Sequence, residues 1–278
     1  MNDNYLIDCS LEELINFKKI FFKDIKKELS LNEDSIRKSL NSNKNIILLK
    51  NKIKEKLLIN NFIIIRNLGT DLDLFILINI LISDKLYFSE RMNLYIHSFR
   101  NKVLADELSE DLSSGGFHTD FSFQDKIPDF ISLQCKEPDP KYPYLGRNYF
   151  SYVDNIFNIL VKNFDISEKY LLNIKLPYTL KNETIWNNPF VKENNKIEMK
   201  LHLKLVDSQK LGAEHYIDGI PISELINQIA LSISKDFVLN KGDIAIFSNR
   251  YLLHKRGECS IDLINRKSRE LNSMRFFI

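Results

Sequence analysis

The sequence has few cysteines, no signal-peptide pattern and no long apolar run. Its three cysteines, Cys9, Cys135 and Cys259, are an odd number in 278 residues, and no two form a Cys-x-x-Cys pair. This pattern argues against a disulfide framework and favours a reduced, cytoplasmic setting in which all three are structural thiols. The N-terminus lacks the basic-then-apolar segment of a secretory signal. The longest apolar stretch, around residues 75–82, is far shorter than the about 20 residues that a membrane helix needs.

An excess of one charge is also lacking. The 39 basic and 37 acidic residues leave a formal net charge of +2, and no basic stripe stands out. We therefore expect neither a nucleic acid nor a membrane as partner. No phosphate-binding glycine loop, zinc knuckle or Ser-His-Asp order is present in the sequence. Hydrophobic residues at 44% and charged residues at 27% are ordinary for a globular protein with a substantial core.

The first third of the chain carries helical patterns. Apolar residues recur at helical spacing over 11–29 and 46–59, and a further helix is expected over 71–83, with Asp71 or Asp73 near its N-cap. Between these segments, residues 62–69 form a short apolar, β-branched run closed by a glycine, which is the pattern of a buried strand.

From about residue 92 the pattern changes to short strands and turns. The expected strands cover 93–99, 128–135, 198–206 and 271–278, the expected helices cover 152–164 and 222–234, and a hairpin is expected over 237–247. No internal repeat or low-complexity linker divides the chain, so we predict one domain over 1–278, in which 1–60 is a helical N-terminal extension. Helices followed by many short strands favour an α+β fold with a jelly-roll core buttressed by N-terminal and inserted helices.

The stretch Gly115-Gly116-Phe117-His118-Thr119-Asp120 carries the chemistry. Side chains two apart in an extended strand point the same way, so His118 and Asp120 can hold adjacent positions on one metal ion. With 5 His and 37 acidic residues among 278, chance alone produces roughly 0.7 such His-x-acid pairs, so the pair is weak evidence by itself. A second histidine, His254, supplies a third ligand. Two imidazoles and one carboxylate form the arrangement of non-haem Fe(II) oxygenases.

An oxygenase of this type also needs a cation for its 2-oxo acid cosubstrate. Arginine suits this task, because its planar fork pairs with a carboxylate through two hydrogen bonds and keeps its proton. Arg266, Arg269 and Arg275 all follow His254 closely. Arg269 and Arg275 are six apart, so on a continuous strand both can face the same interior. We interpret Arg266 as a surface residue.

Several blocks resemble one family. They are Phe117-His118-Thr119-Asp120, the run from Pro128 to Cys135 followed by Asp139, and Gly242-Asp243 to Asn249-Arg250-x-x-x-His254-x-Arg256. Residues 62–68 are similar to an early strand of the same family. Together these blocks resemble the clavaminate synthase-like branch of the taurine dioxygenase superfamily of Fe(II)/2-oxoglutarate-dependent oxygenases, over about residues 62–278.

The resemblance implies a double-stranded β-helix and a cofactor set. His118, Asp120 and His254 would bind Fe(II), with 2-oxoglutarate and O2 as cosubstrates and succinate and CO2 as coproducts. The branch often has Glu where this chain has Asp120, and its C-terminal arginines are usually four apart rather than six. We therefore favour Arg269 as the anchor of 2-oxoglutarate, with Arg275 aiding it or binding substrate. A threonine that helps to bind 2-oxoglutarate in relatives falls near Asn148.

Candidate substrate-binding residues follow the metal pair directly. Phe121, Phe123 and Gln124 are expected to line the substrate pocket, although Phe at alternating strand positions is explained equally well as core. The remaining histidines, His97, His202 and His215, are interpreted as structural or surface residues.

The sequence thus predicts an oxidoreductase: a cytoplasmic Fe(II)/2-oxoglutarate-dependent dioxygenase that hydroxylates an amino acid or amino-acid-like metabolite, free or bound to a peptidyl carrier. Two alternatives stay open. One keeps the cofactors but performs desaturation, ring formation or attack on a sulfonate. The other, of a different class, is a non-catalytic barrel that uses the metal site for sensing or scaffolding.

Overall fold

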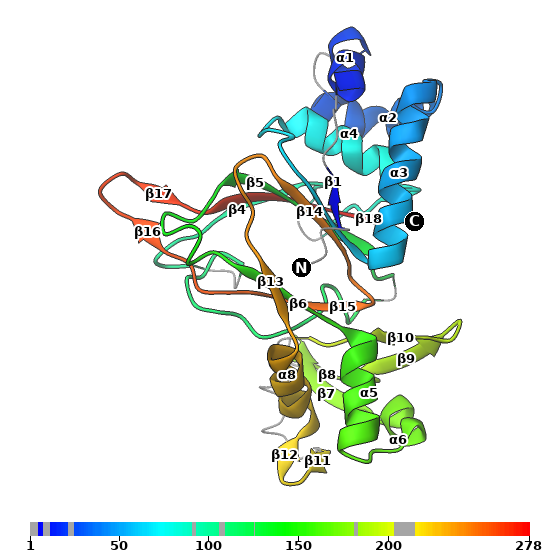
Figure 1. Cartoon of the computed structure of the whole chain (residues 1–278), viewed down its shortest axis with the longest axis vertical. Coiled ribbons are helices and arrows are strands. Elements are labelled where there is room, and N and C mark those ends of the chain that lie inside the picture. The colour runs from blue at the N-terminus through cyan, green and yellow to red at the C-terminus, as the bar shows by residue number, and fades with distance from the viewer. Residues whose placement is uncertain are drawn as a thin grey trace.

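The computed structural model describes residues 5–7, 12–21, 25–90, 93–105, 109–124, 126–180, 183–202 and 215–278. Four helices lie on one face of a large sheet, a small three-stranded sheet lies below its other face, and further helices and hairpins lie below the small sheet (Figure 1). None of the helices in these ranges combines the length and the apolar character that crossing a bilayer requires.

The helical layer consists of α1 (Glu12–Phe21), α2 (Ile25–Leu40), α3 (Lys44–Asn60) and α4 (Leu72–Ile82). The helix α4 is buried on all sides, from Leu74 to Ile82, because other helices and the large sheet surround it. It begins where Asp71 accepts hydrogen bonds from the backbone N–H groups of Asp73 and Leu74, which is an N-cap. The expectations for 46–59 and 71–83 are confirmed.

The segment 11–29 differs from its expectation. It was predicted as one helix, and the structure shows α1 and the beginning of α2, while residues 22–24 lie outside the described part. The helix α2 continues to Leu40, and this second half was not predicted, because Ser30–Leu40 is rich in polar residues; within 33–40, where burial is described, only Ile36 and Leu40 are buried.

The large sheet has the strand order β1 (Leu6–Ile7), β2 (Phe62–Ile65), β14 (Ile244–Ser248), β5 (Phe130–Glu137), β18 (Glu270–Phe277) and β3 (Lys85–Leu86), and β4 (His97–Arg100) also pairs with β18. Its pairings are antiparallel except that of β1 with β2. Because side chains alternate along a strand, Met274 and Phe276 of β18 pack on the helical layer, whereas Leu271 faces the small sheet.

The small sheet has the antiparallel order β13 (Lys235–Phe237), β6 (Asn148–Tyr152) and β15 (Leu252–Arg256). Phe150 and Leu252 from this sheet pack with Phe247 and Leu271 from the large sheet, so an apolar core fills the space between the two sheets. The predicted α+β class is confirmed. The double-stranded β-helix winding and the single-domain division stay predictions.

A second set of elements covers the outer face of the small sheet (Figure 1). Its helices are α5 (Val153–Asn163), α6 (Glu168–Asn173) and α8 (Ile222–Ser232), and its hairpins are β7–β8 (Leu176–Leu180, Glu183–Asn187), β9–β10 (Phe190–Glu193, Lys196–Met199) and β11–β12 (Tyr216–Ile217, Ile220–Pro221). Leu253 of β15 packs among their apolar residues. A separate hairpin, β16–β17 (Ile261–Asp262, Lys267–Ser268), precedes β18.

The hairpin predicted over 237–247 is wrong. The strand β13 pairs with β6 in the small sheet, whereas β14 pairs with β2 and β5 in the large one, so the chain crosses between sheets at this point. The turn itself is present: Gly242 has φ +86°, and a Cβ there would meet the backbone of Gly69 at 2.7 Å. A turn signal fixes the local bend but not the partners of the strands that flank it. The strand β14 is buried on both faces and needs two neighbours.

Candidate metal centre

Two of the predicted ligands are joined by their backbones. The N–H of His118 donates to the carbonyl of His254 at 3.0 Å, and the N–H of His254 donates to the carbonyl of His118 at 3.1 Å. This isolated antiparallel bridge attaches the extended stretch before Asp120 to the strand β15. The two imidazole rings lie side by side, with centroids 4.4 Å apart. Only this single bridge, not a regular strand, forms at His118.

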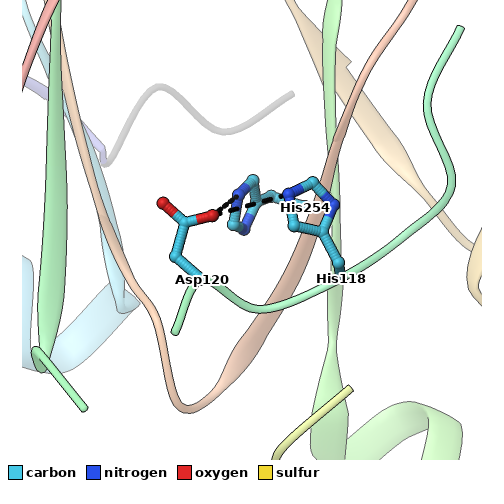
Figure 2. A group of neighbouring side chains, drawn as sticks. All are labelled: His118, Asp120 and His254. Carbon is cyan, nitrogen blue, oxygen red and sulfur yellow. Dashed lines mark ion pairs between the residues drawn. The ribbon is translucent and has the colours of Figure 1, made fainter. Parts of the chain in front are cut away.

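Asp120 completes the group, and the three side chains point toward one another (Figure 2). Its Oδ1 lies 3.5 Å from Nε2 of His118 and 3.7 Å from Nε2 of His254. The three potential ligand atoms lie within 4.8 Å of one another, so one ion can reach all of them. Within the described ranges, this is the one group of three or more His, Cys, Asp or Glu side chains with such spacing.

The electrostatics of the group favour metal binding. Burial acts to raise the pKa of Asp120, but hydrogen bonds with His118 and His254 and the charge of Arg275 outweigh it and hold that pKa well below its usual range. Burial and the neighbouring His118 lower the pKa of His254. Near neutral pH the carboxylate is therefore charged and the His254 imidazole neutral. These are the forms that bind metal ions.

A backbone carbonyl fixes the orientation of the His118 ring. Its Nδ1 lies 3.0 Å from the carbonyl oxygen of Gly116. With an N–H at this position, Nε2 faces Asp120 and would be the atom that binds an ion. The His254 ring packs against the Phe247 ring with centroids 4.9 Å apart, and its Nδ1 has no partner among the described residues.

A second polar site lies at Arg269 and Asn148. The guanidinium of Arg269, only 4% exposed, donates from Nη2 to Oδ1 of Asn148 at 2.7 Å. The described residues place no carboxylate in an ion pair with it, and burial lowers the pKa of Arg269. The amide nitrogen Nδ2 of Asn148 is buried too, and it has no hydrogen-bond partner in the described part of the chain. Both groups are donors, so together they can bind an anion.

The shape of this second site depends on Gly146. A Cβ at that position would lie 2.6 Å from Cβ of Asp139 and 3.3 Å from Cδ of Arg269, and Gly146 has φ +73°. A larger residue here would clash with Asp139 and press against Arg269.

Arg275 occupies a different place from Arg269. Its Nε and Nη2 lie 3.3 and 3.2 Å from Oδ2 of Asp120, the oxygen that faces away from the imidazoles. Its Cζ lies 4.9 Å from the centre of the Phe121 ring. Phe121 also contacts Tyr87, at 5.1 Å between ring centroids, and Tyr87 donates from its hydroxyl to Oε1 of Gln124 at 2.7 Å.

The remaining candidate residues lie outside the metal group. Phe123 packs edge-on against His202 at 5.4 Å and lies among apolar residues, as a core residue would. His97 lies on β4 beside Phe99, and His215 interacts with the hydroxyl of Tyr170, so neither joins the metal group. Arg266 is exposed on the turn between β16 and β17.

Two contacting residues were not found from the sequence. Tyr87 lies 34 positions before Phe121 and 37 before Gln124, and it belongs to no motif. Asn249 belongs to the Asn-Arg-x-x-x-His block, but that block gives no hint that its side chain bonds to both backbone groups of Asp120.

Cys135, beside the second site, is buried and a free thiol, as is Cys259, whereas Cys9 lies outside the described residues. Burial raises the pKa of the Cys135 thiol to about 12, so folding loses stability as the pH rises from about 8.5 towards that value. In native protein at pH 8.5, we expect iodoacetamide to alkylate Cys135 about a thousandfold more slowly than in denaturant, because the thiolate reacts and the thiol does not. Peptide mass spectrometry measures this ratio, and equal rates would contradict the burial.

Compared by sequence, the chain matches no protein-family model and no curated protein. Solved structures are similar in fold. Asparagine oxygenase in complex with Fe(II), 3-hydroxyasparagine and succinate has a TM-score of 0.72 at 13% identity, over 98% of this chain and 93% of that one. The non-haem iron oxygenase OrfP with Fe and α-ketoglutaric acid has a TM-score of 0.66 at 11% identity, with the same coverage. A taurine dioxygenase from Burkholderia xenovorans has a TM-score of 0.55 at 13% identity, over 82% and 80%. The chain therefore has the fold of these non-haem iron oxygenases, which agrees with the resemblance of its motifs.

Proposed function

We propose that this protein is an Fe(II)/2-oxoglutarate-dependent dioxygenase that hydroxylates an amino acid or an amino-acid-like metabolite. The observation that carries the proposal is the convergence of His118, Asp120 and His254, from two distant segments, on one position with their ligand atoms within 4.8 Å. Two imidazole nitrogens and one carboxylate oxygen fit Fe(II) and leave other positions on the ion for cosubstrate and O2. Bound iron supplies the activation of O2.

The residues around the metal group are assigned to cosubstrate binding and to substrate binding. Arg269 and Asn148 hold the distal carboxylate of 2-oxoglutarate through buried donors, where such hydrogen bonds are stronger than in bulk water. Arg275 keeps Oδ2 of Asp120 occupied, which leaves Oδ1 for the ion. Because its guanidinium also stacks on Phe121 near Gln124, the substrate lies on this side and meets a cation suited to a carboxylate.

The substrate class rests on similar folds. Asparagine oxygenase binds 3-hydroxyasparagine and OrfP binds L-Arg, and both cover nearly the whole of this chain. An α-carboxylate on the substrate would complement the guanidinium of Arg275. A substrate carried on a peptidyl carrier remains within the proposal, and so does the predicted cytoplasmic setting.

The decisive experiment measures succinate released by the purified protein with Fe(II), ascorbate, O2 and 2-oxoglutarate. The twenty amino acids and common derivatives are screened singly, and mass spectrometry of each mixture detects a product 16 Da heavier than the substrate, as the insertion of one oxygen atom requires. Succinate formation stimulated by one member would establish both class and substrate. Absence of Fe(II) binding would refute the proposal, and a product lacking two hydrogens would move it to desaturation or ring formation.

A further inference from the structure

The two ligands of the His-x-Asp pair are held in different ways. His118 is paired with His254 through two backbone hydrogen bonds. Asp120, two residues later, is paired with a side chain instead. Its N–H donates to Oδ1 of Asn249 at 2.8 Å, and its carbonyl accepts from Nδ2 of Asn249 at 2.8 Å. One amide side chain thus supplies both bonds that a neighbouring strand would exchange with Asp120.

Asn249 is itself immobilised. It is fully buried, its backbone N–H donates to the carbonyl of Asp129 at 2.8 Å, and its Nδ2 also donates to the carbonyl of Pro128 at 3.2 Å. The bonds fix the orientation of its amide, because Oδ1 must face an N–H and Nδ2 must face two carbonyls. It lies in the turn between β14 and β15, five residues before His254. The turn that contains Asn249 therefore leads from the residue that holds Asp120 to the strand that carries His254.

The chain beyond Asp120 turns, and Nδ2 of Asn187 holds it two residues later by donating to the carbonyl of Ser122 at 2.9 Å. Phe121 has φ +57°, a left-handed conformation that is rare for a bulky residue, and turns the chain away.

Thr119, the residue before Asp120, donates from its N–H to the carbonyl of Leu201 at 2.9 Å. Among the described residues, however, only Asn249 bonds to the backbone N–H and carbonyl of Asp120 itself.

From this geometry we propose that Asn249 is a positioning residue of the metal centre: it fixes the backbone of Asp120, and through it the carboxylate, where the two imidazoles require it. This role rests on the proposed function, since it concerns the Fe(II) site. If the Asp120 carboxylate were free to move in the metal-free protein, binding the ion would have to order it, and this ordering would cost binding free energy. Loss of such supporting bonds typically weakens metal affinity by about 10- to 100-fold.

The test is Fe(II) binding without O2, measured by titration calorimetry, together with the melting temperature of each metal-free protein. Wild type is compared with Asn249→Ala and with Asn249→Asp, which keeps the acceptor for the N–H of Asp120 but loses the donors. The matched control is Asn272→Ala. Asn272 is also buried, with both ends of its amide bonded, to Gln134 at 2.8 Å and to Ser98 at 2.6 Å. It lies on the face of β18 that packs on the helices.

We expect Asn249→Ala to bind Fe(II) about 10- to 100-fold more weakly than wild type, and Asn249→Asp about tenfold more weakly. Asn272→Ala should lose stability but bind Fe(II) within twofold of wild type. If Asn249→Ala fails to fold, the Asn249→Asp variant decides by the same criterion. Wild-type affinity in the folded Asn249 variants, or an equal loss in Asn272→Ala, would overturn the positioning role. A wild-type protein that binds no Fe(II) would overturn the proposed function itself, and this is visible before any variant is made.

Discussion

Replacing His118 or His254 with alanine is expected to abolish Fe(II) binding and 2-oxoglutarate turnover while the protein stays folded. Each imidazole provides one of three ligand atoms that lie within 4.8 Å of one another, and the described residues offer no substitute close by. The backbone bridge between the two histidines involves main-chain atoms only and so survives the substitution. The expected loss of folding free energy is about 1 kcal/mol, since both side chains are partly exposed.

Thermal unfolding with and without Fe(II) separates these effects. A ligand that binds only the folded protein stabilises it, by about 2.7 kcal/mol at a hundred times its dissociation constant, so Fe(II) should raise the melting temperature of wild type under anaerobic conditions. The two variants should show no such shift. His215→Ala is the matched control, because His215 interacts with Tyr170 outside the metal group, and it should behave as wild type. Persistent turnover in both His118→Ala and His254→Ala would show that the metal assignment is wrong.

The metal group shows what a sequence can and cannot supply. The period of an extended chain places His118 and Asp120 on one side, and this needs no knowledge of the fold. The approach of His254, 136 residues later, depends on the pairing of β15 with the stretch at His118, and only the resemblance to a family pointed to it. A long-range pairing leaves no periodic signal in either segment.

The two C-terminal arginines, Arg269 and Arg275, show what residue spacing alone cannot predict. Their even spacing predicted a shared face, and both side chains do turn toward the small sheet: Arg269 bonds to Asn148 of β6, and Arg275 is on the same face of β18 as Leu271 and bonds to Asp120. The spacing could not predict that the two arginines take different partners. These partners are 121 and 155 positions away along the chain, and the pairing of distant strands brings them close. The hairpin predicted over 237–247 was wrong for the same reason, because strand partners are set by distant segments.

Replacing Arg269 with alanine is expected to raise the KM for 2-oxoglutarate by about ten- to a hundredfold, with a much smaller effect on Fe(II) affinity. A charge-assisted hydrogen bond contributes about 1.5–3 kcal/mol, and each 1.4 kcal/mol is a factor of ten. The guanidinium of Arg269 is buried and has Asn148 as its hydrogen-bond partner within the described ranges, so its other N–H groups are available to a carboxylate. Arg269→Lys keeps the charge but not the planar fork, and should raise the KM by an intermediate factor.

Arg266→Ala is the matched control, because Arg266 is a nearby arginine that is exposed on the turn between β16 and β17. Its KM for 2-oxoglutarate should stay within twofold of wild type. Arg275→Ala provides the opposite comparison: since Arg275 bonds to Oδ2 of Asp120, its loss should weaken Fe(II) binding and raise the KM for the amino-acid substrate more than that for 2-oxoglutarate. Steady-state kinetics with each substrate varied in turn measure all four variants. If Arg275→Ala instead raised the KM for 2-oxoglutarate more than Arg269→Ala did, the anchor would be Arg275. The buried cation beside Asn148 would then serve the fold alone.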